Sequence, residues 1–155
     1  MNRIIASAVF LLGMAGSVNA AIIEYDLRGG NGQAYSYDFT VDGLTMTATA
    51  TWNGFSNIAE VTRDMHGLGV RNSPDDNDDI DGVGRNDYLT LTFDFIVDLV
   101  GLNFGHDTNN DEFDLYVDGL FKDRNLETTG FWETFAMGAR RGTSFTVRAS
   151  ANNDN

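Results

Sequence analysis

An acidic segment at residues 72–87 holds the densest group of possible ligands in the chain, with six Asp and three Asn among sixteen residues. Its oxygen-bearing side chains alternate at Asn77, Asp79 and Asp81, directly before Gly82. An EF-hand loop begins in this way, because the glycine allows a tight turn that aims several oxygens at one point. Ca²⁺ takes about six to eight oxygen ligands, so the segment predicts a calcium site.

The segment does not continue as an EF-hand. Counted from Asn77, the twelfth position is Tyr88, where an EF-hand has Glu, and no helical pattern flanks the loop. We therefore expect a calcium loop of another kind, completed by Asp87 or by backbone oxygens. The alternative is a solvated acidic turn, although the five Asp between residues 75 and 81 repel one another unless a cation screens them.

A second acidic loop follows at residues 106–112, where Asp107, Asn109 and Asp111 again alternate. Glu112 stands where a turn glycine would help, so this loop is the weaker calcium candidate beside a plain loop. Calcium, held chiefly by the first loop, is the one cofactor that the sequence predicts.

Few residues of this chain could carry out catalysis. It has no Cys, which excludes disulfides and Cys-ligated metal sites, and its two His, His66 and His106, stand apart from any catalytic motif. A glycine-rich phosphate loop is also absent, and Lys122 is the single lysine. We expect no catalytic residue. A polysaccharide hydrolase with two Asp as acid and base ranks third among the functions considered.

Aromatic side chains offer a second kind of site, because the apolar faces of sugars pack on aromatic rings. A platform could be formed by Trp52, Trp132, Tyr35, Tyr37 and Tyr88. Trp52 and Trp132 lie near the ends of expected strands and are the better candidates for carbohydrate contact. Tyr35 and Tyr37 share a strand face with Phe39, so we expect them in the core.

The sequence predicts that these residues are positioned by β-strands. Alternation of apolar and polar residues, interrupted by Gly, Asn and Asp turns, predicts about eight to ten short strands and no sustained helix. Asp42-Gly43 and Asp118-Gly119 are two-residue hairpin signals. The pattern predicts an all-β, antiparallel sandwich of jelly-roll type. The expected strands are residues 22–27, 35–41, 44–52, 59–63, 88–95, 98–104, 113–117, 121–127, 131–137 and 144–149.

Export is predicted by the first twenty residues, which combine Arg3, an apolar run and small residues before Ala21. We expect a signal peptide at residues 1–20 and a single mature domain at residues 21–155, without a membrane span, in a secreted or cell-surface protein. The net charge of −13 disfavours nucleic acid as a partner, because phosphates would be repelled.

The order of motifs resembles small exported PEP-CTERM proteins of Gram-negative bacteria, which exosortases sort. The resemblance is carried by residues 67–70, by Asp81-Gly82 with Gly84, by residues 86–94, by residues 111–119 and by residues 142–147. It covers roughly residues 22–155, whereas the Pro-Glu-Pro sorting tail of the family is not found in residues 1–155. The resemblance implies an extracellular β-sandwich associated with the envelope, biofilm or exopolysaccharide, with no established molecular activity.

Together these observations favour a non-enzymatic protein of the cell surface or extracellular matrix, stabilised by calcium and associated with extracellular polysaccharide. A carbohydrate-binding module with an aromatic sugar-stacking face is the alternative. The oligomeric state is left open by the sequence.

Overall fold

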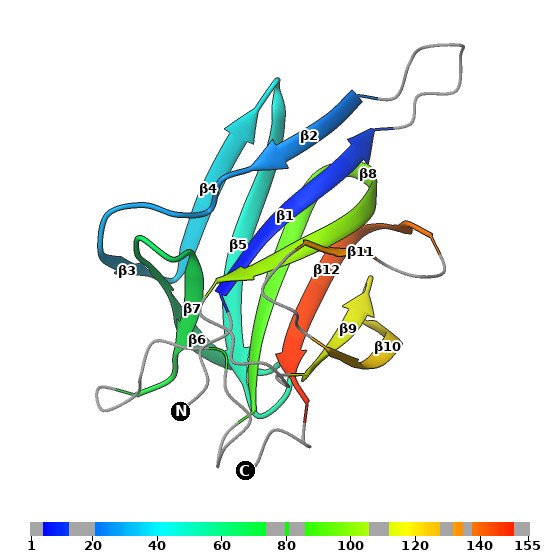
Figure 1. Cartoon of the computed structure of the whole chain (residues 1–155). Coiled ribbons are helices and arrows are strands. Elements are labelled where there is room, and N and C mark those ends of the chain that lie inside the picture. The colour runs from blue at the N-terminus through cyan, green and yellow to red at the C-terminus, as the bar shows by residue number, and fades with distance from the viewer. Residues whose placement is uncertain are drawn as a thin grey trace.

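A computed structural model of the chain describes residues 5–12, 21–73, 80, 86–105, 112–127, 132–134 and 138–150 (Figure 1). Every regular element in these ranges is a β-strand, and none is a helix. The strands are β1 (Ile5–Leu12), β2 (Ala21–Tyr25), β3 (Gly32–Ala34), β4 (Ser36–Val41), β5 (Leu44–Trp52), β6 (Asn57–Arg63), β7 (Leu68–Arg71), β8 (Asp87–Gly105), β9 (Glu112–Val117), β10 (Leu120–Glu127), β11 (Trp132–Thr134) and β12 (Arg140–Ala149).

The strands form one antiparallel sheet, in the order β10-β9-β12-β8-β1-β7-β6-β5-β4. Three short strands lie off this path: β2 pairs with β1, β3 with β6, and β11 with β8. The 19-residue strand β8 organises the sheet, because its first half pairs with β5 and its second half pairs with β1. In Figure 1, β8 and β12 run side by side, and β9 and β10 extend the sheet beyond β12.

Tight turns set the register of the two hairpins that the sequence predicted. Asp42 and Gly43 have φ values of 51° and 81°, and Asp118 and Gly119 have φ values of 49° and 74°. Positive φ at both central residues is typical of a type I′ turn, whose twist matches that of the flanking strands. The turns therefore join β4 to β5 and β9 to β10 in the predicted pairs.

The core lies on one side of β5, β8, β9 and β12, where every second residue is apolar and buried. Burying a Leu or Phe side chain stabilises the fold by roughly 1.5–3 kcal/mol. Strand β2 closes over this side: the ring of Tyr25 lies 5.9 Å from that of Phe93, and its hydroxyl donates to the carbonyl oxygen of Leu44 at 2.8 Å. Buried apolar residues of the core cluster on these four strands are Leu44, Met46, Ala48, Ala50, Leu89, Leu91, Phe93, Val97, Leu99, Leu102, Phe104, Phe113, Leu115, Val117, Phe145, Val147 and Ala149.

The other side of the same strands, called the polar face below, carries hydroxyl groups. Thr49 pairs with Thr90, which pairs with Thr146, so a row of threonines crosses three strands. The hydroxyl oxygens of Thr90 and Thr146 lie 2.8 Å apart. Members of this face on β5, β8 and β12 are Thr45, Thr47, Thr49, Thr51, Thr90, Thr92, Ser144 and Thr146.

The all-β antiparallel prediction is confirmed for the described residues, whereas the jelly-roll sandwich remains a prediction. The expected number of strands was too low, since the described residues after residue 20 contain eleven strands and β1 is a twelfth. Residues 88–95 and 98–104 were expected as two strands and form the single strand β8. Tyr35 was expected in the core but is 68% exposed, because β4 begins one residue later and Tyr35 lies at the bend before it.

Part of the predicted signal peptide forms strand β1 in the uncleaved chain. Ile5–Leu12 pairs with β8 on one side and with β2 on the other, and it reaches β7 through Ala6 and Leu68. Removal of residues 1–20 would therefore take away the strand that connects β2 to β8. Cleavage after Ala20 remains a prediction.

Candidate functional site

Four aromatic rings gather at one end of the polar face. We call Phe55, Tyr88, Tyr116 and Phe121 the aromatic cluster. The ring of Phe55 lies 5.2 Å from that of Tyr88 and 5.5 Å from that of Tyr116. The ring of Tyr116 lies 6.3 Å from that of Tyr88 and 5.3 Å from that of Phe121. These centroid separations and tilted arrangements are typical of stabilising aromatic pairs.

Strand register brings the cluster together from four separate elements. Tyr88 on β8 and Tyr116 on β9 both pair with β12, through Arg148 and Thr146 respectively. Phe121 on β10 pairs directly with Tyr116. Period-2 alternation turns the side chains of Tyr88 and Tyr116 away from the core, because their neighbours along β8 and β9 are buried. Phe121 lies on the same side of the sheet because it pairs with Tyr116.

The fourth ring comes from the turn that joins β5 to β6. Phe55 follows Asn53 and Gly54, whose φ values are 48° and 101°. These left-handed conformations suit Asn and Gly, and they curl the turn back toward β8. The backbone N–H of Asn53 donates to the carbonyl oxygen of Asn86 at 2.8 Å, which holds the turn beside the start of β8 and places Phe55 over Tyr88.

The four rings differ in exposure: Phe55 and Phe121 form the exposed rim of the cluster, and Tyr88 and Tyr116 form its floor. Phe55 is 52% exposed and Phe121 is 43% exposed, whereas Tyr88 is only 7% exposed. Tyr116 is half-buried, and burial raises the pKa of its phenol. A ligand would therefore meet the two phenylalanine rings first, with the tyrosines fixing their positions from below.

A buried ion pair supports the floor of the cluster. The Arg148 guanidinium pairs with the Asp114 carboxylate, and it lies 5.9 Å from the centre of the Tyr88 ring. Burial alone would lower the pKa of Arg148, but hydrogen bonds to Tyr88 and Asp114 outweigh it and raise that pKa. Asp114 also accepts the backbone N–H of Asn125 at 3.1 Å, which ties β10 to β9 beside the rings.

The arrangement suits non-covalent binding of a sugar chain. Exposed rings offer apolar surface for sugar stacking, and the adjoining polar face carries hydroxyl groups at half-buried and exposed positions, such as those of Thr49 and Thr92. The sequence identified only Tyr88 of this cluster. Tyr116 could have been predicted to face outward, because it alternates with Leu115 and Val117, whereas Phe121 lies between two exposed residues and has no such pattern. The approach of Tyr116 to Phe55 depends on pairings between distant strands.

Asp87, the predicted end of the first calcium loop, is fully buried at the start of β8. Its Oδ1 accepts a hydrogen bond from Asn72 Nδ2 at 2.9 Å. Ile80, in the middle of the acidic segment, is 1% exposed and belongs to the core cluster. The segment is therefore anchored at its base and at its centre. The other predicted ligands, Asn77, Asp79 and Asp81, lie outside the described residues.

The ligands of the second predicted loop and the side chain of Trp132 lie outside the described part of the chain. Asp107, Asn109 and Asp111 lie outside the described residues, and of Trp132 only the backbone is described, in β11 opposite Asn103. Trp52 is half-buried on the apolar side of β5 and packs against the core. Its role in carbohydrate contact remains a prediction.

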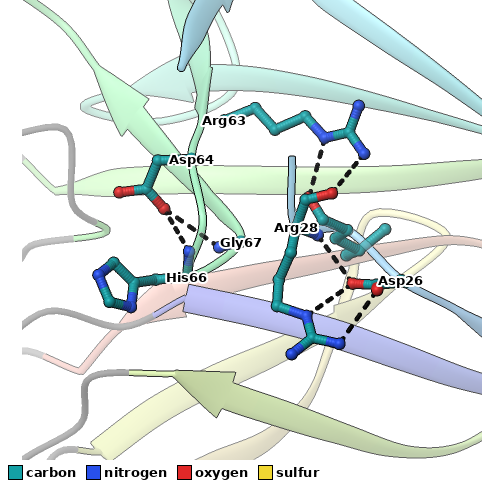
Figure 2. A network of polar contacts seen from close by, with 7 residues as sticks. Asp26, Arg28, Arg63, Asp64, His66 and Gly67 are labelled. Carbon is teal, nitrogen blue, oxygen red and sulfur yellow. Dashed lines mark hydrogen bonds and ion pairs between the residues drawn. The ribbon is translucent and has the colours of Figure 1, made fainter. Parts of the chain in front are cut away.

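His66 lies in a loop that is held by a network of hydrogen bonds, separate from the aromatic cluster (Figure 2). The Asp64 carboxylate accepts the backbone N–H groups of His66 at 2.7 Å and of Gly67 at 3.2 Å. Arg63 donates to the carbonyl oxygens of Leu27 at 3.1 Å and of Arg28 at 2.5 Å. These bonds hold the loop before β7 against the segment after β2, which is a structural role.

Arg28 completes this network by an ion pair with Asp26 at 2.8 Å. The hydrogen bond from Arg28 lowers the pKa of Asp26. A hollow of about 410 Å³ adjoins the network and is lined by Asn31, Gly32, Gln33, Thr62, Arg63 and Asp64. Arg63 and Asp64 belong both to the lining and to the network, and the lining contains no aromatic ring.

Within the described ranges, no group of three or more His, Asp or Glu side chains is arranged to hold a metal ion. The same ranges contain no helix long and apolar enough to cross a membrane. No protein-family model matches the chain, and neither a curated protein nor a solved structure matches it.

Proposed function

We propose that this chain is a non-enzymatic carbohydrate-binding protein of the cell surface or extracellular matrix, and that the aromatic cluster is its contact with polysaccharide. The observation that carries the proposal is the cluster itself. It presents Phe55 and Phe121 to solvent beside a sheet face lined with hydroxyl groups. In our proposal the domain is a β-sandwich whose polar face is left open for the polymer.

The packing of the cluster supports this function over a purely structural one. A structural aromatic cluster would be expected to bury its rings, whereas the two rim rings here are about half exposed. Exposed aromatic groups next to one another are typical of binding sites. Tyr88 and Tyr116 hold these rings in place, so little ordering is needed when a sugar binds.

Calcium has a structural role in this proposal. Asn77, Asp79, Asp81 and Asp87 would supply oxygen ligands to one ion, and the second loop, with Asp107, Asn109 and Asp111, would be a weaker site. Support comes from the buried Asp87 carboxylate and from the anchoring of Ile80 in the core. Such an ion would fix the shape of the loop without taking part in any reaction.

The test of carbohydrate binding is a glycan array followed by affinity electrophoresis in the soluble polysaccharide that gives the strongest signal. We expect the double substitution Phe55→Ala with Phe121→Ala to weaken binding about tenfold or more, because two stacking surfaces are lost. Phe95→Ala is the matched control, since Phe95 is 62% exposed and is not part of the cluster.

A thermal melt of each variant shows whether the fold is intact. The proposal fails if the double variant binds as the unchanged protein does. Trp52→Ala tests the site predicted from sequence: loss of binding in that variant alone would move the sugar contact from the aromatic cluster to the end of β5.

A further inference from the structure

We infer that the polysaccharide bound at the aromatic cluster carries carboxylate groups, and that Arg124 is the residue that pairs with them. The inference rests on the proposed function and names the class of sugar that the site would select. It is drawn from the position of Arg124, from the pairing of the other arginines, and from the net charge of the chain.

Arg124 is held at the rim of the cluster by an aromatic ring. Its guanidinium carbon lies 5.1 Å from the centre of the Phe121 ring, which is a cation–π arrangement. Its positive charge reaches the Tyr116 phenol, where it favours the ionised form. The guanidinium is exposed, so it is positioned beside the stacking surface and remains accessible to a ligand.

Four other arginines of the described ranges already have a carboxylate partner. Their ion pairs are Arg28 with Asp26, Arg140 with Asp123, Arg141 with Asp98, and Arg148 with Asp114. Arg124 forms no ion pair with a described carboxylate. The described part of the chain therefore leaves this guanidinium without an internal anion, although acidic residues outnumber basic ones by 23 to 10.

The aspartates nearest the cluster along β9 and β10 are engaged elsewhere. Asp114 is buried against Arg148, and Asp123 is paired with Arg140. Asp118 accepts two backbone N–H groups and one hydroxyl, from Thr143 and Ser144. Their charges are partly neutralised, so they oppose an incoming anion less than free carboxylates would.

A sugar acid fits both features of this site. The apolar face of its ring would stack on Phe121 and Phe55, and its carboxylate would accept paired N–H bonds from Arg124, whose planar fork matches carboxylate geometry. The excess of acidic residues in the chain repels such a polymer, but this repulsion is screened beyond about 8 Å at physiological salt. The cluster would therefore determine where an acidic polysaccharide binds.

The experiment compares polygalacturonate with the same polymer after chemical reduction of its carboxylates. Affinity electrophoresis of the full chain is carried out at 0.15 M salt and in excess EGTA, so that calcium cannot bridge protein and polymer. We expect tighter binding of the acidic polymer, and Arg124→Gln should weaken that binding about tenfold while changing affinity for the reduced polymer less than about twofold.

Arg141→Gln is the matched control, because Arg141 is also an exposed arginine but is paired with Asp98 away from the cluster. Equal binding of the two polymers, or equal losses in the two arginine variants, would overturn the inference. Neither result bears on stacking, which is judged separately: Phe121→Ala should weaken binding of both polymers. If it weakens neither, the proposed function itself is wrong.

Discussion

Asn72 and Asp87 form a hydrogen bond across the base of the acidic segment, with Nδ2 of the first 2.9 Å from Oδ1 of the second. Asp87 is fully buried, and fifteen residues separate the two along the chain. The bond therefore joins the end of β7 to the start of β8 and holds the two ends of the acidic segment together.

Asn72→Ala should destabilise the protein by about 1–3 kcal/mol, because a buried carboxylate loses one of its donors. Chemical denaturation measures this loss. Asn57→Ala is the control: Asn57 Nδ2 donates at 3.0 Å to the uncharged carbonyl oxygen of Trp52, so its loss should be smaller. Equal losses of stability in the two variants would mean that the charge of Asp87 does not strengthen its hydrogen bond with Asn72.

Calcium should raise the melting temperature of the full chain. An ion that binds only the folded state stabilises it by mass action, and a site of about 10⁻⁴–10⁻³ M affinity at 2 mM calcium contributes on the order of 1 kcal/mol, or a few degrees. The double substitution Asp79→Asn with Asp81→Asn should abolish the shift seen between calcium and EGTA. If calcium has no effect on the unchanged protein, the acidic segment is a solvated turn.

Strand positions could be predicted from the sequence because alternation and hairpin turns are local properties. Residues 44–52 were predicted with the bounds that β5 has, and both Asp-Gly turns are present. Strand β7 was missed, since Gly69 interrupts its short apolar run and has low β-propensity. Two strands were predicted where β8 is continuous, and Phe95 and Ile96, which lie between β5 and β1 pairing, are exposed.

The aromatic cluster could not be predicted in the same way. Its four rings come from β8, β9, β10 and the turn after β5, and only the register of these strands makes them neighbours. Sequence reasoning favoured Trp52 because it lies near the end of an expected strand, but the structure packs Trp52 against the core from the apolar side of β5. Which side of a strand faces solvent can be read from alternation, whereas contact between strands cannot.

Asp118 should make the stability of the protein depend on pH in acid. The backbone N–H of Thr143, at 2.9 Å, is the main cause that lowers the pKa of Asp118 from 3.8. Because the pKa of Asp118 is lower in the folded state, its carboxylate contributes fully to stability above the pKa of the unfolded state. This contribution is lost as pH falls through the pKa of the folded state. Asp118→Asn should therefore be less stable than the unchanged protein at pH 7, by about 0.5–1 kcal/mol because solvent screens the exposed group.

Urea denaturation at pH 7 and in steps below pH 4 measures this dependence, and the two proteins should become equally stable in strong acid. Asp42→Asn is the control. Asp42 occupies the same turn position, with φ of 51°, but no described group donates a hydrogen bond to its carboxylate. A pH-independent difference for Asp118→Asn would show that the side chain acts through turn geometry and not through its charge.

Removal of residues 1–20 should expose backbone groups of β2 and of the second half of β8. Among described strands, β2 pairs only with β1, and residues 98–105 of β8 pair with β1 through Ile5–Leu11. Hydrogen exchange at those amides of residues 98–105 that bond to β1 should therefore be slow in the full chain and faster in residues 21–155. Amides of β8 that bond to β5, β11 or β12 should stay protected. Equal protection in both would mean that another segment takes the position of β1 after cleavage.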